Sequence, residues 1–290
     1  MDRAELALDC RNLHGEGILW NHHDRRVWWT DIHGKRLWWL EPSSGTSGSI
    51  AMADRVCCFA PRDKGGFILA LAKEVAFFDP GTGELATIHR FEPDKLATRL
   101  NDGRTDRQGR FIAGGMNEGS GPEKSTVLRI DPDESVTTII TGVGCANSTC
   151  FSPDGRRMYF ADTSVGTIWV YDYDPGTGVP GNRQVLNDFK GEPGIPDGSC
   201  VDAEGAVWNA EWEGRRVVRI LPDGSIDRVV EVPVLKPTCC AFGGPELETL
   251  YITTSRLEAT REQIAAEPTA GSLFAFKPGV RGLVDAPFAG

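Results

Sequence analysis

Four polar residues stand inside apolar, β-like segments, where their side chains could do chemistry. A carboxylate or an amide in a buried strand destabilises the fold unless a partner compensates it. Together these residues offer only oxygen donors, which hard divalent cations such as Ca²⁺, Mg²⁺ and Mn²⁺ prefer and which Zn²⁺ and Fe²⁺ also accept. A site with three or four protein ligands leaves coordination positions open for water and substrate, as in a catalytic centre. The four residues are Glu16 in HGEGILW, Asn101 in RLNDG, Asn147 in ANSTCF and Asp197 in IPDGSC.

A unit that recurs every 41 to 50 residues sets the spacing of these positions. Each unit opens with a strand, makes a tight turn such as SPDGRR (152–157), and continues through a second strand such as MYFAD (158–162) and a third. Aromatic and β-branched runs between DG and PGTG turns are typical of β-hairpins, and a period of about 40 to 50 residues is typical of propellers. The sequence therefore predicts an all-β fold, a six-bladed β-propeller, as a single domain over residues 1–290. Aligned on their first turn, the units place there Asp24, Gly65, Gly109, Gly155, Gly205 and Leu247.

The first strand of each propeller blade lines the central channel, so equivalent positions of six blades converge on the axis. Four of the six residues that stand eight positions before the aligned turns are polar, although their strands are otherwise apolar. This pattern predicts a central metal-binding channel. For any one of these residues alone, the natural alternative is that it ties inner strands together by hydrogen bonds around a water-filled channel. The six residues are Glu16, Cys57, Asn101, Asn147, Asp197 and Cys239.

Three further segments complete the expected architecture. The strand around residues 4–8 should complete the last blade and close the ring, which leaves no open sheet edge. A short segment, residues 257–267, has helical periodicity inside the last unit. The Gly-rich loop at 114–125 is long for a hairpin and is either a lid over the channel mouth or a disordered segment.

Other side chains of chemical interest are expected to be structural. The eight tryptophans lie mostly in strands, where packing between blades is the default, although one or two could wall a ligand site. His14 stands beside Glu16, but a single histidine is more often a hydrogen-bonded side chain than a ligand. The eight cysteines include two adjacent pairs and no zinc-binding spacing, which indicates buried, reduced thiols.

The balance of charge limits the classes of partner. The net charge is −10 and no cluster of Lys or Arg is present, so the electrostatic footprint for nucleic acid or an anionic membrane is missing. No apolar run approaches the roughly 18 residues of a membrane span, and the first residues do not resemble a secretory signal. We expect a cytoplasmic protein, a monomer or weak homo-oligomer, that binds a small molecule.

Six segments resemble the SMP-30/gluconolactonase/regucalcin family, in the same order and at similar spacing over almost the whole chain. The resemblance implies a six-bladed propeller that binds one divalent metal ion (Ca, Zn, Mg, Mn or Fe(II)) and hydrolyses sugar lactones to aldonic acids. Within the family the sequence is most similar to bacterial sugar lactonases of pentose and hexose oxidation pathways. The segments are HGEGILW, RLNDGRTDRQGRFIAGGM, ANSTCFSPDGRRMYFADT, IPDGSCVDAEGAVW, GRRVVRILPDG and FGGPELETLYITTSR.

The resemblance also implies a metal centre and a catalytic residue. The family's metal ligands match Glu16, Asn147 and Asp197, three of the four residues that the period selects. In the implied reaction the ion polarises the lactone carbonyl, and Asp197 also serves as general base toward the attacking water.

Substrate binding is implied for three more positions. The family's Arg-x-Asn motif matches Arg99 and Asn101, which lie two apart and therefore on one face of a strand. The loop after the next strand often reads GTM followed by an acidic residue in the family. Here it reads GGMNEG, and Glu118 is the counterpart.

Competing functions differ in what they require of the sequence. A serine hydrolase would need a nucleophile elbow, and no G-x-S-x-G is present. A related propeller with the same centre could hydrolyse an aryl ester or a phosphotriester. A non-catalytic, metal-binding propeller is the third possibility, and VWWTD (27–31) is similar to the repeats of receptor propellers. A propeller that serves as a protein-binding platform has no need of carboxylates and amides at one axial level.

Overall fold

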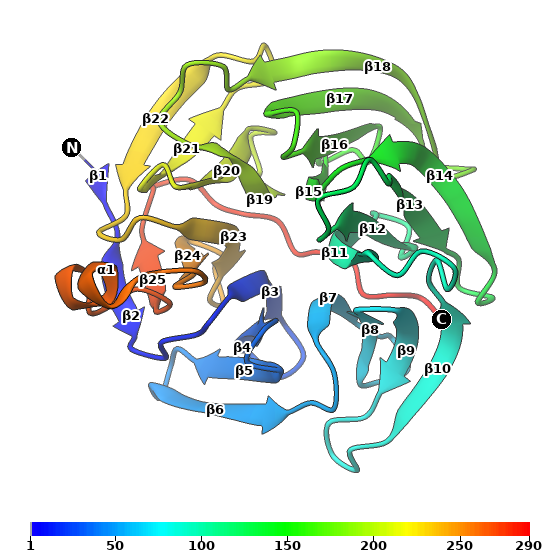
Figure 1. Ribbon diagram of the computed structural model, residues 1–290, viewed down its shortest axis with the longest axis horizontal. Coiled ribbons are helices and arrows are strands. Elements are labelled where there is room, and N and C mark those ends of the chain that lie inside the picture. The colour runs from blue at the N-terminus through cyan, green and yellow to red at the C-terminus, as the bar shows by residue number, and fades with distance from the viewer. Residues whose placement is uncertain (1) are drawn as a thin grey trace.

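Six sheets surround a central axis in the computed structural model, which describes residues 2–290 (Figure 1). In each sheet the first strand lies innermost, and neighbouring first strands contact one another in cyclic order around the axis. The predicted six-bladed β-propeller is confirmed. The innermost strands are β3 (Gly15–Asn21), β7 (Val56–Pro61), β11 (Thr98–Thr105), β15 (Ala146–Phe151), β19 (Ile195–Val201) and β23 (Pro237–Gly243).

Three more antiparallel strands complete each blade from the inside outward. The second strands are β4 (Arg26–Asp31), β8 (Phe67–Leu71), β12 (Phe111–Asn117), β16 (Arg157–Asp162), β20 (Val207–Trp212) and β24 (Thr249–Thr254). The third strands are β5 (Arg36–Glu41), β9 (Glu74–Phe78), β13 (Ser125–Ile130), β17 (Thr167–Asp174), β21 (Arg216–Ile220) and β25 (Leu273–Phe276). The outer strands of the first five blades are β6 (Thr46–Ala51), β10 (Leu85–Arg90), β14 (Val136–Val143), β18 (Val179–Asp188) and β22 (Ile226–Glu231).

The N-terminal segment supplies the outer strand of the last blade. Strand β2 (Glu5–Leu8) pairs antiparallel with β25, which confirms the predicted closure of the ring. The preceding strand β1 (Asp2–Arg3) runs parallel to β22 of the fifth blade, a pairing that the sequence does not indicate. The same short segment therefore joins the last two blades (Figure 1).

Apolar side chains of neighbouring blades pack against each other to form the core. One cluster joins Tyr159 of the fourth blade to Val218 of the fifth, and Trp29 and Trp208 are among the largest fully buried side chains. The burial of apolar area is the main stabilising contribution in such a fold. The eight cysteines are free thiols, and six of them are buried, in agreement with the expected structural role.

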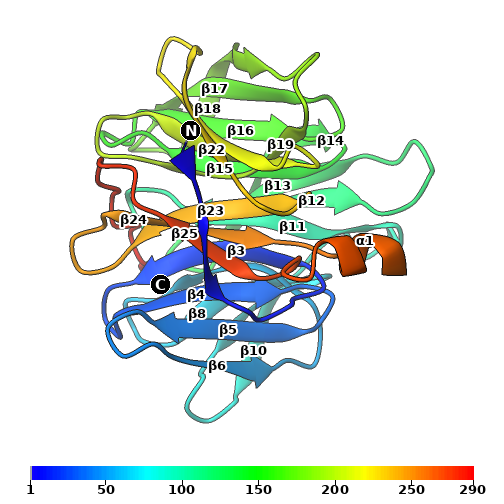
Figure 2. The same cartoon turned by 90° about the vertical axis from the view of Figure 1, so that its left-hand side faces the viewer.

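The helix α1 (Arg261–Ala266) lies within the segment predicted to be helical, but it is shorter than that segment. Thr260 caps it, and the reciprocal bond between Thr260 and Gln263 forms a capping box. None of its residues is buried, so no packing extends it, and it projects from the body of the propeller (Figure 2). Within residues 2–290, no helix is long and apolar enough to cross a membrane.

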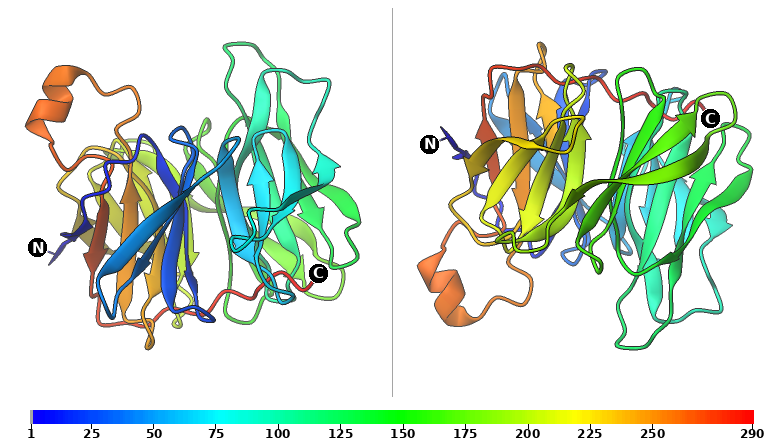
Figure 3. Two further views of the ribbon diagram at one scale, coloured as in Figure 1. Left: turned by 90° about the horizontal axis from the view of Figure 1, so that it is seen from below. Right: turned by 90° about the horizontal axis from the view of Figure 1, so that it is seen from above.

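The C-terminal tail crosses the face of the propeller opposite to the face that carries α1 (Figure 3). The Arg281 carbonyl accepts from an N–H of the fifth blade, the Phe288 N–H donates to the second blade, and the Ala289 N–H donates to the third, at 2.8, 2.7 and 3.0 Å. The tail therefore links blades that are far apart in the sequence.

Replacing Phe288 with alanine is expected to destabilise the protein by about 3–5 kcal/mol. The Phe288 side chain is fully buried in the cluster between the second and third blades, so truncation leaves a cavity and weakens the attachment of the tail. Denaturant titration measures this free energy of unfolding. Val284→Ala is the control, because Val284 is exposed in the same tail. A loss of stability in Phe288→Ala as small as that expected for an exposed residue would contradict the prediction.

Each innermost strand contains a local shift of register, of the β-bulge type, at the level of the predicted ring. A bulge bends the strand and re-aims its side chains. Gly17 has a φ of +56°, and the non-glycine Ser148 adopts the same value, so two of the bulges use left-handed backbone. The shifts lie between Glu16 and Leu19, Val56 and Cys58, Leu100 and Gly103, Asn147 and Cys150, Pro196 and Ser199, and Pro237 and Cys240.

Candidate functional site

A pocket of about 240 Å³ opens where these bulges meet. Its walls come from the starts of β3, β11, β15 and β19, from the ends of β12, β16 and β20, and from the segment that leads into α1. Five of the six predicted site residues line the pocket, and the sixth, Glu118, does not. The lining residues are His14, Glu16, Arg99, Asn101, Met116, Cys145, Asn147, Thr163, Ile195, Asp197, Trp212, Leu257 and Glu258.

Glu16 and Asp197 form a buried pair of acidic side chains in the pocket. Only 6% of Glu16 and 5% of Asp197 is exposed. Burial raises the pKa of both carboxyl groups; the charge of Asp102 raises both further, and the charge of Glu16 also raises that of Asp197. The charge of Arg99 acts in the opposite direction, but its guanidinium is already bound to Glu118. The pair is therefore an electrostatically costly arrangement that a bound cation would relieve.

Asn147 is oriented by a chain of hydrogen bonds. Thr163 Oγ1 donates to the Pro196 carbonyl at 2.8 Å, and it lies 2.7 Å from Asn147 Nδ2. Because a hydroxyl carries a single hydrogen, Thr163 can only accept from the Asn147 amide. Asn147 Oδ1 is consequently turned away from Thr163, toward Asn101 Nδ2 at 3.4 Å, and is a neutral oxygen donor in the pocket.

Side chains at this level of the channel link neighbouring innermost strands by hydrogen bonds. Ser148 Oγ donates to the Asp197 backbone carbonyl at 2.6 Å, and Asn101 Nδ2 donates to a backbone carbonyl of β15 at 2.9 Å. The Glu16 carboxylate instead accepts from the adjacent Gly17 N–H at 2.9 Å. The interpretation of the ring residues as strand ties therefore applies to Asn101, whereas the carboxylates of Glu16 and Asp197 interact with each other.

The four polar residues reach the pocket from two register positions. Glu16 and Asn147 pair directly with the second strand of their blade, just before the bulge, whereas Asn101 and Asp197 lie within the bulge. The cysteines at the other two ring positions are buried and do not line the pocket. The positions counted as equivalent along the chain are thus at one level but not in one register, because the bulges shift the strands locally.

Arg99 is held in place by the carboxylate of Glu118. Its Nε donates to Glu118 Oε1 at 2.7 Å, and Arg55 donates to both oxygens of the same carboxylate at 2.8 and 3.0 Å. Burial by itself would raise the pKa of Glu118, but the hydrogen bonds and charges of the two arginines lower it overall. Arg99 Nη1 also donates to Asn101 Oδ1 at 2.7 Å. Glu118 is therefore directed at Arg99 and positions it, while Arg99 and Asn101 line the pocket.

Several lining residues have weak signals in the sequence. His14 precedes Glu16 by two residues, so the alternation of a strand places both on one side. Burial lowers the pKa of His14, and the charge of Arg99 lowers it further. Trp212 ends a second strand and walls the pocket, while the other tryptophans line no part of it. Of the candidate lid at 114–125, Met116 is the residue that lines the pocket.

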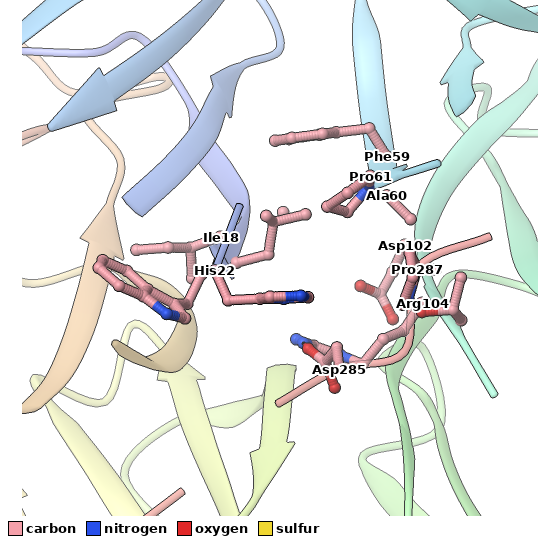
Figure 4. A pocket seen from close by; sticks show the side chains of 14 residues that line it. Ile18, His22, Phe59, Ala60, Pro61, Asp102, Arg104, Asp285 and Pro287 are labelled. Carbon is pink, nitrogen blue, oxygen red and sulfur yellow. The ribbon is translucent and has the colours of Figure 1, made fainter. Parts of the chain in front are cut away.

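A second, smaller cavity of about 20 Å³ lies further along the channel (Figure 4). Asp102 and Arg104 of β11 face it, as does Asp285 of the C-terminal tail, which forms an ion pair with Arg104. Arg104 also donates to the Ser199 carbonyl at 3.0 Å. A space of this size holds about one water molecule. The tail lines the channel at this end, whereas the acidic pair lines the larger pocket.

Comparisons with known proteins agree with this architecture. The sequence model of the SMP-30/Gluconolactonase/LRE-like region matches residues 14–256. L-arabinolactonase of Azospirillum brasilense is 39% identical, with 99% of this chain and 96% of the relative covered. The 6-deoxy-6-sulfogluconolactonase of Pseudomonas putida is 35% identical, with 95% of each chain covered.

Solved structures give the same result. The crystal structure of regucalcin from Agrobacterium tumefaciens, described as a calcium-binding protein, superposes with a TM-score of 0.94 at 30% identity, over 99% of this chain and 97% of that one. The predicted resemblance is confirmed over nearly the full length. This chain belongs to the SMP-30/gluconolactonase/LRE-like family.

Proposed function

We propose that this protein hydrolyses a sugar lactone to the corresponding sugar acid with the help of one divalent metal ion, bound by Glu16, Asn147 and Asp197. The observation that carries the proposal is the buried pair of carboxylates, which faces an accessible pocket; the positive charge of Arg99 offsets the pair only in part, since its guanidinium is bound to Glu118. The names of the relatives, an L-arabinolactonase and a 6-deoxy-6-sulfogluconolactonase, support a sugar lactone as the substrate.

The donor set fits a hard divalent ion. The two carboxylates balance a charge of +2, and Asn147 Oδ1 adds a neutral oxygen. Asn101 Oδ1 is already an acceptor for Arg99, so we assign Asn101 to the substrate. Within residues 2–290 no three His, Cys, Asp or Glu side chains are grouped as for a metal site, so an ion here depends on the amide and on water as well. Ca, Mg, Mn, Zn and Fe(II) all accept such donors.

In the proposed reaction, Asp197 transfers the proton from the attacking water to the departing oxygen. When bound, the ion polarises the lactone carbonyl and stabilises the negative charge that develops on its oxygen. Asp197 accepts the proton of the water that adds to the carbonyl carbon. The ring C–O bond then breaks, and the departing ring oxygen takes that proton, which leaves the free sugar acid. Asp197 is suited to this role because its carboxylate lines the pocket, whereas its backbone is fixed through Ser148.

Arg99 and Asn101 orient the sugar ring. The bonds to Glu118 and Asn101 use Nε and Nη1 of Arg99, so Nη2 is the guanidinium nitrogen left for a substrate hydroxyl. A guanidinium fixed on two sides loses little conformational entropy when it binds the substrate.

A pH-indicator screen tests the proposed function. Metal-free protein is reloaded with each of Ca, Mg, Mn, Zn and Fe(II) and offered pentono- and hexonolactones, an aryl ester and a phosphotriester. We expect metal-dependent turnover of at least one sugar lactone. Binding of a metal without turnover of any lactone would contradict the proposal and favour a metal-binding protein. Turnover of the aryl ester or phosphotriester alone would assign the centre to another ester class.

Glu118→Gln is expected to raise KM for the lactone by roughly tenfold, with a smaller change in kcat, because a charge-assisted bond that orients Arg99 is weakened. Initial rates over a range of lactone concentrations separate the two constants. Glu123→Gln, in the same loop, is the matched control and should leave both constants unchanged. A loss confined to kcat would show that Glu118 acts on the chemical step instead.

A further inference from the structure

We propose that His14 binds the substrate, with its Nε2 accepting a hydrogen bond from a hydroxyl of the lactone. This inference rests on the proposed function and adds a residue to it. His14 lines the same pocket as Glu16 and Arg99, and it is only 9% exposed. Neither the metal-binding nor the proton-transfer role described above uses it.

The hydrogen bonds of Ser255 determine which ring nitrogen of His14 carries the proton. Ser255 Oγ donates its single hydrogen to the Leu13 carbonyl at 3.0 Å and accepts from the Leu257 N–H at 3.0 Å. The same oxygen lies 2.9 Å from His14 Nδ1. We assign the Ser255 hydrogen to the Leu13 carbonyl, which can only accept, and with this assignment Nδ1 is the donor in the contact. In the neutral imidazole, Nε2 then keeps a lone pair and is a hydrogen-bond acceptor.

The ring of His14 is fixed in place before any ligand binds. Its backbone N–H donates to Asp31 Oδ1 at 3.0 Å, and its carbonyl accepts from the Ile32 N–H at 3.0 Å. The ring packs edge-to-face between Trp212 and His33, with centroids 5.6 Å away in each case. A side chain locked by such contacts can hold a substrate group with little loss of entropy.

The pocket has a chemical need for this acceptor. Each hydroxyl of a sugar lactone both donates and accepts hydrogen bonds, whereas Arg99 offers donors only. The carboxylates of Glu16 and Asp197 are assigned to the metal and to proton transfer, and Glu258, the third carboxylate of the lining, is exposed to solvent, unlike His14. The Nε2 lone pair of His14 therefore complements Arg99, and the two side chains can recognise opposite sides of a sugar hydroxyl.

His14→Phe tests the proposal, because phenylalanine keeps the ring and its packing but has no acceptor. The parent lactone and a set of mono-deoxy analogues are compared with metal-loaded wild type and variant. We expect the variant to lose roughly tenfold in kcat/KM on the parent, mainly through KM. We also expect this loss to vanish for the one analogue that lacks the matching hydroxyl. His14→Gln should recover part of the activity through its amide oxygen, and His23→Phe, at an exposed turn, should match wild type.

A second readout separates this inference from the proposed function. Binding of the aldonic acid product is followed by isothermal titration calorimetry, and thermal unfolding checks that each variant is folded. If wild type hydrolyses the lactone but His14→Phe has the same penalty on every analogue, or none, the inference is overturned and the function stands. If wild type binds the sugar acid but hydrolyses no lactone, a tenfold weaker binding in His14→Phe supports the inference while the function fails. Unchanged binding in that case overturns both.

Discussion

Asp197→Asn is expected to lower kcat for lactone hydrolysis by roughly 10³-fold, because it removes the group that accepts the proton of the attacking water. It also removes one of the two negative charges that balance the metal ion. The variant should fold normally. Ser148 and Asn209 donate to the backbone carbonyl of Asp197 and not to its carboxylate, so both bonds survive the substitution.

The comparison uses saturating metal, so that weaker metal affinity is separated from loss of the base. Asp94→Asn, at an exposed loop position, is the matched control and should retain wild-type kcat. A lactone activity of Asp197→Asn within a few-fold of wild type would assign proton transfer to another group. A loss that more metal fully restores would limit Asp197 to the role of ligand.

The second large effect expected is on stability, where a divalent cation should stabilise the protein through Glu16. The pKa of this carboxyl is raised on folding, from 4.5 to about 8, by burial and by the charge of Asp102. A carboxyl group whose pKa is raised by folding stabilises the protein at a pH below its pKa in the unfolded state. This contribution is lost as the pH rises through its pKa in the folded state. The metal-free protein should therefore become less stable between about pH 4.5 and pH 8, by a few kcal/mol.

Added cation should reverse this loss at pH 8 and have little effect near pH 4.5, because only the ionised pair binds it. Glu16→Gln should weaken both the dependence of stability on pH and the stabilisation by cation. Without a charge to bury at this position, the metal-free variant should be more stable than metal-free wild type at pH 8, and cation should raise its Tm much less.

Thermal unfolding at several pH values, with chelator and with 1:1 to excess cation, measures both effects. Glu84→Gln, which replaces an exposed carboxylate, is the control and should follow wild type. A metal-induced rise in Tm of the same size in Glu16→Gln and wild type would place the ion elsewhere.

The propeller is predictable from the sequence because its signals are local. Each PDG or PGTG turn marks a hairpin, and the turns repeat with a period that only a few folds share. The level of the ring residues follows from the same repeat count. In the structure Glu16, Asn101, Asn147 and Asp197 line one pocket at this level. The offset in register between these four residues is not predictable in this way, since bulges depend on how neighbouring strands pack.

The parts of the site that the sequence does not reveal depend on contacts between distant residues. The Glu118 carboxylate accepts hydrogen bonds from Arg99 and also from Arg55, which belongs to another blade. Trp212 and Leu257 line the pocket from two different blades. The C-terminal tail likewise lines the channel through Asp285, whose partner Arg104 lies far away in the chain. No local pattern encodes these pairings.

The most direct test of the proposed centre is a calorimetric titration of the metal-free protein with the ion that best supports activity, with lactone turnover measured at each step. We predict that one ion binds per chain and that turnover rises in proportion to the bound ion. Both signals should disappear in the Glu16→Gln, Asp197→Asn double variant. Full turnover by the metal-free protein, or unchanged binding of the ion by the double variant, would contradict the account.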